Sequence, residues 1–353
     1  MQKNKVLFIL KRRQDYNAEK HAASKSMSTG LYNSAQYMYD MLLNAGVDTK
    51  IVVVEDNNKI DKEVHQYKPT HVIIEALWVV PTKFSALCKL HPNVKWIIRL
   101  HSEVPFLANE GIAFDWIGDY ITFKNVIVAT NSDVALNDVR VFIQSKTDWP
   151  KWKVKEKVIY LPNFYPQNLK SKRYKLDDEY IDIACFGAIR PMKNHVMQAI
   201  AAIKFAEAIG KKLRFHINSG RVEQRGETVI NNLNGIFAHV YDSGHRLINH
   251  SWMPREKFLE LCSTIDIGMQ VSFSETFNIV TADMLSQGVP IVGSDEIPWI
   301  NDWFAASPTD SDDMCKKLLS TNKFPWLNTY TNQFLLNTYT NKTRKIWLNY
   351  FKY

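Results

Sequence analysis

The chain has 353 residues, of which 46% are hydrophobic, and a formal net charge of +8 at pH 7. Its length favours two domains over one core, and its apolar content excludes a chain that is disordered throughout. The four cysteines lack metal-ligand spacing and predict reduced thiols, and no apolar run is long enough for a signal peptide or a membrane span, so we expect a soluble, cytoplasmic protein.

The first half of the chain alternates short apolar runs with stretches of helical period. The runs predict strands at 6–10, 51–54, 71–74, 94–100, 126–129 and 158–161, and a helix at 32–43 follows Gly30. This alternation predicts a parallel sheet with helices on both faces, whose ligands bind at the carboxyl ends of the strands. Polar clusters follow those ends, at 11–13 with Gly30, at 101–103, at 130–132 and at Asn163.

The second half repeats the alternation after a charged stretch, 166–180, that predicts a linker. Strands are expected at 181–186, 213–217, 237–241, 265–271 and 289–292, and helices at 195–209, 254–261, 279–285 and 312–319. We therefore predict a first domain at 1–165, a linker at 166–180 and a second domain at 181–330. A C-terminal helix at 331–353 is expected to pack back on the first domain. The fold class is α/β, with two facing doubly wound domains.

The excess positive charge is concentrated between Ser145 and Lys175. This segment holds nine Lys or Arg residues against two acids, or +7, and aromatic residues are interleaved with them. Two interpretations stay open: a solvated lysine-rich face, or a docking surface for a polyanion, meaning nucleic acid or an anionic membrane.

The stretch Ser272–Ser294 combines a polar loop, a helix and a buried strand. The loop carries Glu275, Gly288 is expected to close the helix in a left-handed conformation, and Pro290 prevents its continuation. Half of a βαβ unit is thus predicted, and the loop at such a helix start is where these units hold anions.

The spacing of Glu275 and Asp283, followed by Gly288 and Pro290, resembles the E-x7-E element of the retaining family 4 glycosyltransferases of the GT-B fold. The sequence Phe186–Asn194 resembles the G-R-x-x-x-x-K loop of that family. Two residues depart from the E-x7-E pattern: Asp283 replaces the second glutamate, and Asn278 replaces a glycine. In the second loop the basic partner is Arg190 rather than the residue after Gly187.

The resemblance implies a nucleotide-diphosphate-sugar donor, no required metal and a retaining reaction. Glu275 would bind the hydroxyls of the donor sugar, and Arg190 and Lys193, after Gly187, would stabilise the diphosphate. The alternative for this cation pair is a set of surface charges near a helix start. The backbone N–H groups at 278–280, those of Asn278, Ile279 and Val280, would face the phosphates or the sugar.

Asp283 would accept hydrogen bonds from the ribose hydroxyls, its alternative being a solvent-facing helix residue. In the first domain, His101 would lie near the transferred sugar, unless it is a polar cap at a strand end. The Thr29–Gly30 loop corresponds to a glycine-pair loop of the family. Asn131, Ser132 and Asn163 match short family elements and are expected to be structural. Asp310 and Asp312 spell D-x-D before a helix, where we expect capping rather than metal binding.

Three functions follow from these residues. The first is sugar transfer to a polyanion, such as a hydroxymethylated base in phage-type DNA, through the basic segment. The second is transfer to a glycan or lipid-linked acceptor at a membrane surface. The third is nucleotide-sugar binding without turnover, suggested by the departures at Asp283 and Asn278.

Overall fold

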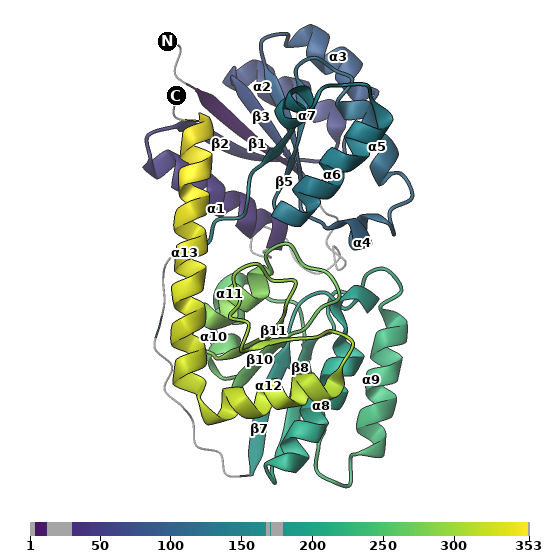
Figure 1. The fold of residues 1–353 in the computed structure, drawn as a ribbon, viewed down its shortest axis with the longest axis vertical. Helices are drawn as coiled ribbons and strands as arrows, with labels where there is room; N and C mark the ends of the chain where they lie inside the picture. Colours follow the sequence, from purple (N-terminus) through teal and green to yellow (C-terminus); the bar gives the residue numbers. More distant parts are fainter. Residues whose placement is uncertain (1–3, 13–29, 167–169, 171–178, 352–353) are drawn as a thin grey trace. The chain divides into compact units, whose positions relative to one another are not determined.

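The structure is a computed structural model that describes residues 4–12, 30–166, 170 and 179–351 (Figure 1). The chain forms two compact units. Of the described residues, unit 1 comprises 4–12, 30–166 and 340–351, and unit 2 comprises 170 and 179–339. Most of the expected linker, including 171–178, lies outside the described residues, and so does Arg13 of the first polar cluster.

Unit 1 contains a parallel sheet whose six described strands follow the order β2-β1-β3-β4-β5-β6. The strands are β1 (Lys5–Lys11), β2 (Asp48–Val54), β3 (His71–Glu75), β4 (Lys95–Leu100), β5 (Val126–Thr130) and β6 (Val158–Tyr160). All six were predicted from apolar runs, and the predicted helix after Gly30 is α1 (Gly30–Asn44).

Both faces of this sheet are buried. On β1, Leu7 and Ile9 pack into one apolar cluster, and Val6 and Phe8 pack into another on the opposite face. Because successive side chains of a strand point to opposite faces, continuous apolar runs are what a sheet covered on both sides requires. The helices after α1 are α2 (Ile60–Tyr67), α3 (Lys83–Leu90), α4 (Val104–Leu107), α5 (Ala113–Tyr120), α6 (Asp133–Lys146) and α7 (Lys151–Lys157).

Unit 2 contains a second parallel sheet, whose six described strands follow the order β12-β11-β10-β7-β8-β9. They are β7 (Tyr180–Cys185), β8 (Lys212–Asn218), β9 (Arg246–His250), β10 (Ile267–Gln270), β11 (Ile291–Ser294) and β12 (Ala305–Ala306). The helices are α8 (His195–Ala208), α9 (Glu227–His239), α10 (Arg255–Ser263), α11 (Ile279–Ser286), α12 (Ser311–Lys323) and α13 (Pro325–Phe351).

The predicted strand at 237–241 is wrong. Phe237 ends the apolar face of α9, on which Val229 and Leu233 are also buried at intervals of four residues. The apolar residues of this segment therefore recur at helical intervals. The strand prediction considered only the apolar residues from Phe237 onward and missed the earlier ones. The true strand, β9, was missed because it lies at the edge of the sheet and has a mixed sequence, RLINH.

Two local predictions about unit 2 are confirmed. Gly288 has a positive φ of 78° after α11, the conformation that glycine adopts without a Cβ clash. Asp310 caps α12, because its carboxylate accepts hydrogen bonds from the backbone N–H groups of Asp312 (2.8 Å) and Asp313 (3.0 Å). The D-x-D sequence is thus a helix cap.

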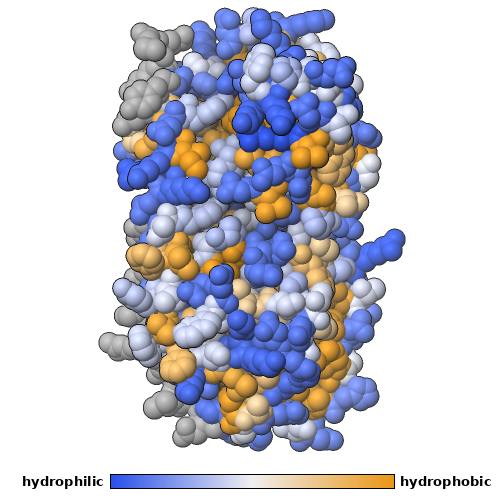
Figure 2. All heavy atoms as spheres, viewed as in Figure 1, coloured by the Kyte–Doolittle hydropathy of each residue, from blue (hydrophilic) through white to orange (hydrophobic). Residues whose placement is uncertain are grey.

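Helix α13 begins at Pro325, earlier than the sequence predicted, and ends in unit 1. There Trp347 stacks on Phe8 with ring centroids 6.1 Å apart and donates a hydrogen bond to the carbonyl of Pro162 (2.8 Å). Among the described residues, no helix has the length and hydropathy needed to cross a bilayer. The surface in Figure 2 accordingly shows hydrophobic residues in separate areas among hydrophilic ones.

Candidate functional site

The sheet order of unit 2 has a topological switch point between β7 and β10. Strands β8 and β9 lie on one side of β7, and strands β10, β11 and β12 lie on its other side. The chain connections after β7 and after β10 therefore run in opposite directions along the sheet. Ligands of doubly wound sheets bind at this switch point, beyond the carboxyl ends of the two strands. The segments that follow β7 and β10 are the two loops in which the sequence predicted the donor site.

The loop after β7 is held in a fixed conformation. Gly187 has a φ of 119°, and its N–H donates to Asn218 Oδ1 at 3.1 Å. Asn194 ends the loop in the left-handed region, with a φ of 59°, and its amide donates to the carbonyls of Val271 (3.0 Å) and Pro308 (2.7 Å). The start of α8 is therefore tied to the residue that follows β10.

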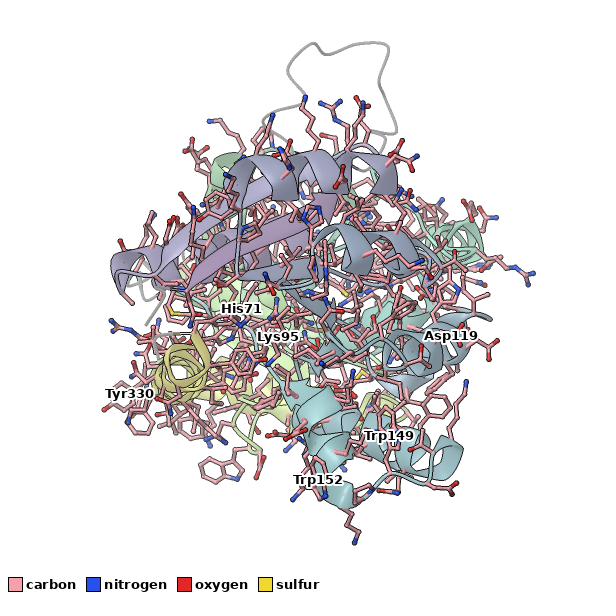
Figure 3. The ribbon with its side chains drawn as sticks, turned by 90° about the horizontal axis from the view of Figure 1, so that it is seen from above. His71, Lys95, Asp119, Trp149, Trp152 and Tyr330 are labelled. Atoms are coloured by element: carbon pink, nitrogen blue, oxygen red, sulfur yellow. The ribbon has the colours of Figure 1, made fainter. Side chains whose placement is uncertain are left out.

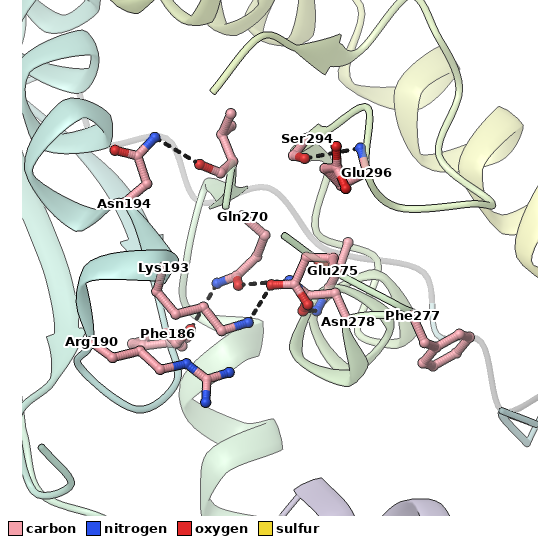
Figure 4. A network of polar contacts seen from close by, with 12 residues as sticks. Phe186, Arg190, Lys193, Asn194, Gln270, Glu275, Phe277, Asn278, Ser294 and Glu296 are labelled. Carbon is pink, nitrogen blue, oxygen red and sulfur yellow. Dashed lines mark hydrogen bonds and ion pairs between the residues drawn. The ribbon is translucent and has the colours of Figure 1, made fainter. Parts of the chain in front are cut away.

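Gln270, the last residue of β10, links the two loops. Its side-chain amide donates to the carbonyl of Phe186 (2.9 Å), and its carbonyl accepts from the amide of Asn278 (3.1 Å) (Figure 4). Gln270 is buried and was not among the predicted site residues. The sequence signal that could have identified it is a polar residue at the end of an apolar strand.

Asn278, which stands where the family has glycine, adopts the left-handed backbone conformation that glycine would adopt there. Its φ is 56°, and its side chain caps α11 by accepting a hydrogen bond from the N–H of Thr281 at 3.0 Å. Asparagine is one of the few residues besides glycine that tolerates the left-handed conformation, and it is a preferred N-cap residue. This departure from the family motif therefore preserves the local geometry.

The structure brings Lys193 and Glu275 together. The Lys193 ammonium donates to Glu275 Oε1, and the two side chains are 12% and 9% exposed (Figure 4). Arg190 lies in the same loop and faces Glu223 Oε2 at 3.5 Å. Two cations of the loop after β7, each paired with a carboxylate from another segment, thus lie at this switch point, next to the N-termini of α8 and α11.

Several buried polar atoms at these helix starts have no hydrogen-bond partner among the described residues. They are both ring nitrogens of His195 and the hydroxyls of Ser272 and Thr281. Burial, with the charges of Lys193 and Arg190, lowers the pKa of His195 to about 3, so its ring is neutral at pH 7. Buried polar groups are nearly always hydrogen-bonded, and unsatisfied ones call for an unseen partner.

Asp283 is not a solvent-facing helix residue. It is 3% exposed, and the Arg255 guanidinium at the start of α10 binds both of its oxygens at 2.7 and 2.9 Å. Such bidentate pairs fix both groups in one orientation. Arg255 was missed because its partner lies 28 residues away in sequence and no local pattern joins them.

In unit 1, His101 belongs to a buried charged network. Its Nε2 lies at hydrogen-bond distance from Glu75 Oε2, and both oxygens of Glu75 accept from Arg99 Nη1 at 3.1 and 3.2 Å. Glu75 and Arg99 are both 0% exposed. Burial and the charge of Arg99 lower the pKa of His101 although Glu75 opposes them. The ring of His101 is thus held by Glu75 just after the end of β4.

The other polar positions of unit 1 have structural contacts. Ser132 caps α6 by accepting from the N–H of Ala135 (3.0 Å), Asn163 accepts a hydrogen bond from Arg99, and Asn131 lies buried between β5 and that cap. Gly30 begins α1. His101 and Gly30 belong to unit 1, while the other predicted site residues belong to unit 2.

The basic segment is described in part, since Lys172, Arg173 and Lys175 lie outside the described residues. Lys157 is structural, because its ammonium donates to three backbone carbonyls around β5. Lys153 lies over the ring of Trp149 at 3.9 Å. Exposed side chains remain around α7, where Figure 3 labels Trp152, which is 62% exposed; the exposed lysines there are Lys146, Lys151 and Lys155.

No protein-family model and no curated protein matches the chain. Solved structures match over nearly the whole length. Sucrose-phosphate synthase from Thermosynechococcus elongatus is 12% identical, with 97% of this chain and 96% of that chain covered and a TM-score of 0.66. A UDP-forming alpha,alpha-trehalose-phosphate synthase from Burkholderia vietnamiensis is 9% identical, covering 99% and 96%, with a TM-score of 0.66.

HepE from Anabaena, in complex with UDP, is 12% identical, covering 98% of each chain with a TM-score of 0.61. These neighbours are GT-B glycosyltransferases. At such identities the likeness concerns the fold, and it agrees with the two doubly wound sheets described above. The chain therefore has the GT-B fold that its loop motifs predicted.

Proposed function

We propose that the chain is a glycosyltransferase that moves a sugar from a nucleotide-diphosphate donor to a hydroxyl acceptor. The observation that carries this proposal is the convergence of Lys193 and Glu275 at the switch point of unit 2. Cations and two helix N-termini suit a diphosphate, and a carboxylate suits the hydroxyls of a sugar.

The donor diphosphate would lie against the start of α8. Lys193 and Arg190 would stabilise the negative charge that develops as the diphosphate leaves. The unsatisfied nitrogens of His195 support a ligand at this helix start, since a phosphate or ribose group would give them partners. UDP in the HepE complex makes uridine diphosphate the first donor nucleotide to test.

Glu275 would orient the donor sugar, and the backbone N–H groups of Asn278, Ile279 and Val280 would face its phosphate side. Gly187 supports this arrangement, because a Cβ built at that position would lie 3.9 Å from Val280 Cγ2. The segment after β7 therefore passes close to the first turn of α11. A side chain at position 187 would occupy space between these two segments.

Retention is the stereochemical outcome that we propose. The bond between the anomeric carbon and the phosphate oxygen breaks, and the acceptor oxygen bonds to the same face of that carbon. The acceptor proton passes to the leaving phosphate, so the products are a nucleoside diphosphate and a glycoside. His101, held by Glu75, would bind the transferred sugar, as the family resemblance implies. NMR of the anomeric proton in the first-formed product tests this outcome, and an inverted configuration would refute it.

Asp283 would accept hydrogen bonds from the ribose hydroxyls, and the bidentate pair with Arg255 would fix its orientation. The shorter side chain of aspartate relative to glutamate would then be compensated by its fixed orientation. An Asp283→Asn variant that binds the donor nucleotide as well as the parent would contradict this role.

Donor binding and turnover separate the candidate functions. A thermal-shift panel of UDP, ADP and GDP and their glucose conjugates should give one nucleotide that raises the melting temperature. Lys193→Met should lower its affinity about 10- to 100-fold, as expected for a charge-assisted contact. Lys204→Met is the matched control, because Lys204 is an exposed α8 lysine paired with Asp312.

The outcomes of this panel distinguish an enzyme from a binding protein and test the donor site. Binding without hydrolysis or transfer favours the nucleotide-sugar-binding protein over the enzyme. Equal effects of the two lysine substitutions, or no shift with any nucleotide, would refute the site. The described residues contain no group of three or more His, Cys, Asp or Glu side chains that could hold a metal ion. From the family resemblance we propose that transfer proceeds without added metal, and a loss of turnover in EDTA that Mg²⁺ restores would refute that part.

Two acceptor classes are candidates, each supported by a different surface. Modified DNA is supported by the exposed lysines and Trp152 around α7. Retention on duplex DNA that falls steeply with salt and that Lys151→Glu with Lys155→Glu abolishes would support it. A membrane-associated acceptor is supported by three exposed aromatic side chains of α13, those of Trp326, Tyr330 and Phe334.

A further inference from the structure

The first turns of α13 expose three large aromatic side chains. Trp326, Tyr330 and Phe334 are 65%, 68% and 62% exposed. Residues four apart lie on the same side of an α-helix, so the three rings form one row, here called the aromatic face. All three belong to unit 2, and Figure 3 labels Tyr330 beside α13.

The opposite side of the same turns is polar and buried. Asn328 and Asn332 are 0% exposed. The Asn328 amide pairs with the backbone of Ile291, accepting from its N–H and donating to its carbonyl at 2.8 Å each. Asn332 accepts from the N–H of Asn301 at 2.8 Å. Unit 2 is thus held by the polar side of α13 while the aromatic side faces outward, the reverse of an ordinary surface helix.

In the sequence, the charged residues from position 314 onward are all basic, and the acids Asp302, Asp310, Asp312 and Asp313 lie before them. Residues 314–353 contain seven Lys or Arg residues and no Asp or Glu, or +7 in 40 residues. Lys316 and Lys323 are exposed in α12, just before the aromatic face, and the Lys323 ammonium lies 5.3 Å from the centre of the Phe324 ring. Basic residues return on α13 at Lys342, while 325–339 carries no charge.

This distribution fits an anionic lipid surface better than a nucleic acid. A protein that tracks a strand of nucleic acid places cations along the row of stacking rings. Here the row is uncharged and the cations lie before and after it. Tryptophan and tyrosine, with an apolar body and a polar tip, favour the headgroup region of a bilayer, and flanking lysines favour anionic headgroups.

We propose that the aromatic face of α13 docks unit 2 on an anionic lipid bilayer. The three rings enter the boundary between headgroups and acyl chains, and the lysines of α12 contact the phosphates. Docking is peripheral, in keeping with the absence of a membrane-spanning helix among the described residues. The proposal concerns binding and does not depend on the glycosyl transfer proposed above.

Co-flotation of the full chain with lipid vesicles tests the proposal. The chain should float with vesicles of phosphatidylcholine and phosphatidylglycerol and bind pure phosphatidylcholine more weakly. The variant Trp326→Ala/Tyr330→Ala/Phe334→Ala should lose at least about 100-fold in affinity, since each ring buries ~100 Å² or more of apolar surface on docking. Its melting curve and its nucleotide-induced thermal shift should match the parent, because the exposed rings support neither the core nor the donor site.

Trp152→Ala is the matched control, because Trp152 is an equally exposed tryptophan on a lysine-rich helix of unit 1. It should leave vesicle binding unchanged. A second readout uses brominated lipid, which quenches a tryptophan at bromine depth. Quenching should fall in Trp326→Phe, which keeps an aromatic ring, and stay the same in Trp152→Phe.

Failure of the parent chain to bind either vesicle would overturn the proposal, as would triple-variant binding equal to that of the parent. Equal losses in the triple and Trp152 variants would reassign the effect to general surface hydrophobicity. Retention on single-stranded DNA that the triple substitution abolishes, without vesicle binding, would assign the aromatic face to nucleic acid instead. A concentration-dependent dimer abolished by the same substitutions would assign it to a second copy.

Discussion

Replacing Glu75 with leucine leaves the Arg99 guanidinium inside unit 1 without the carboxylate that faces it. Arg99 is 0% exposed, and its remaining acceptors, the carbonyl of Leu161 (3.0 Å) and the Asn163 side chain, are neutral. Removing one partner of a buried ion pair costs about 3–5 kcal/mol, because the other charge stays buried and uncompensated. We expect Glu75→Leu to destabilise unit 1 by that amount.

The double variant Glu75→Leu/Arg99→Met distinguishes the contribution of the ion pair to stability from the contribution of side-chain packing. It removes both charges and replaces them with apolar side chains, so it should cost less than the sum of the two single variants, with a coupling of about 2 kcal/mol or more. Amide hydrogen exchange of β3 and β4 in urea reports the stability of unit 1 separately from unit 2. A loss below about 1 kcal/mol in Glu75→Leu, or additive single effects, would refute the reasoning.

The same network predicts the response to acid. Burial by itself raises the pKa of Glu75, but the charges of Arg99 and His101 and their hydrogen bonds hold it below its ordinary value of 4.5. A carboxylate with a lowered pKa contributes stability that is present above its unfolded pKa and lost as the pH falls through its folded pKa. Unit 1 should therefore lose stability below about pH 4.5, and Glu75→Leu should lack that part of the loss.

Three further predictions concern unit 2. Asn278→Val should cost about 2 kcal/mol in chemical denaturation, because valine resists the left-handed conformation and removes the cap of α11, whereas Asn278→Gly should cost a few tenths. Asn328→Leu leaves a backbone N–H and carbonyl of β11 unpaired and should cost about 2–4 kcal/mol, seen as faster amide exchange in β11. Burial raises the pKa of Asp182, but hydrogen bonds from His216 and Arg214 lower it to about 2. About 2 kcal/mol should thus be lost between pH 4 and 2, and Asp182→Asn should show no such loss.

Apart from β9 and β12, which lie at the two edges of the second sheet, the strands of both sheets could be predicted from sequence, because buried parallel strands are continuous apolar runs and their ends carry polar residues. The β7 and β10 strands are examples, and Gly187 and Glu275 follow them as expected. Prediction failed at the edge of the sheet. There β9 has a mixed sequence, since one side of an edge strand is open, and the apolar residues of α9 were taken for a strand.

The candidate site was predictable as far as its motifs are local. Lys193 and Glu275 lie in loops whose sequences carry a signature, and the structure pairs them. Gln270 and Arg255 carry no such signature. Each acquires its role through a partner far away in sequence, Phe186 in the first case and Asp283 in the second, and only the folded chain brings those partners into contact.

By itself, the sequence determined the α/β alternation, the donor loops and the residues in them. The periodicity of apolar residues, the backbone conformations of glycine and asparagine, and the charge of a loop are all local properties of the chain. Tertiary structure decided how those residues are held. It placed Glu75 between Arg99 and His101, and it turned the polar side of α13 inward, so that Trp326 and its neighbours face outward. Burial and hydrogen bonding are relations between distant segments, and a one-dimensional pattern does not contain them.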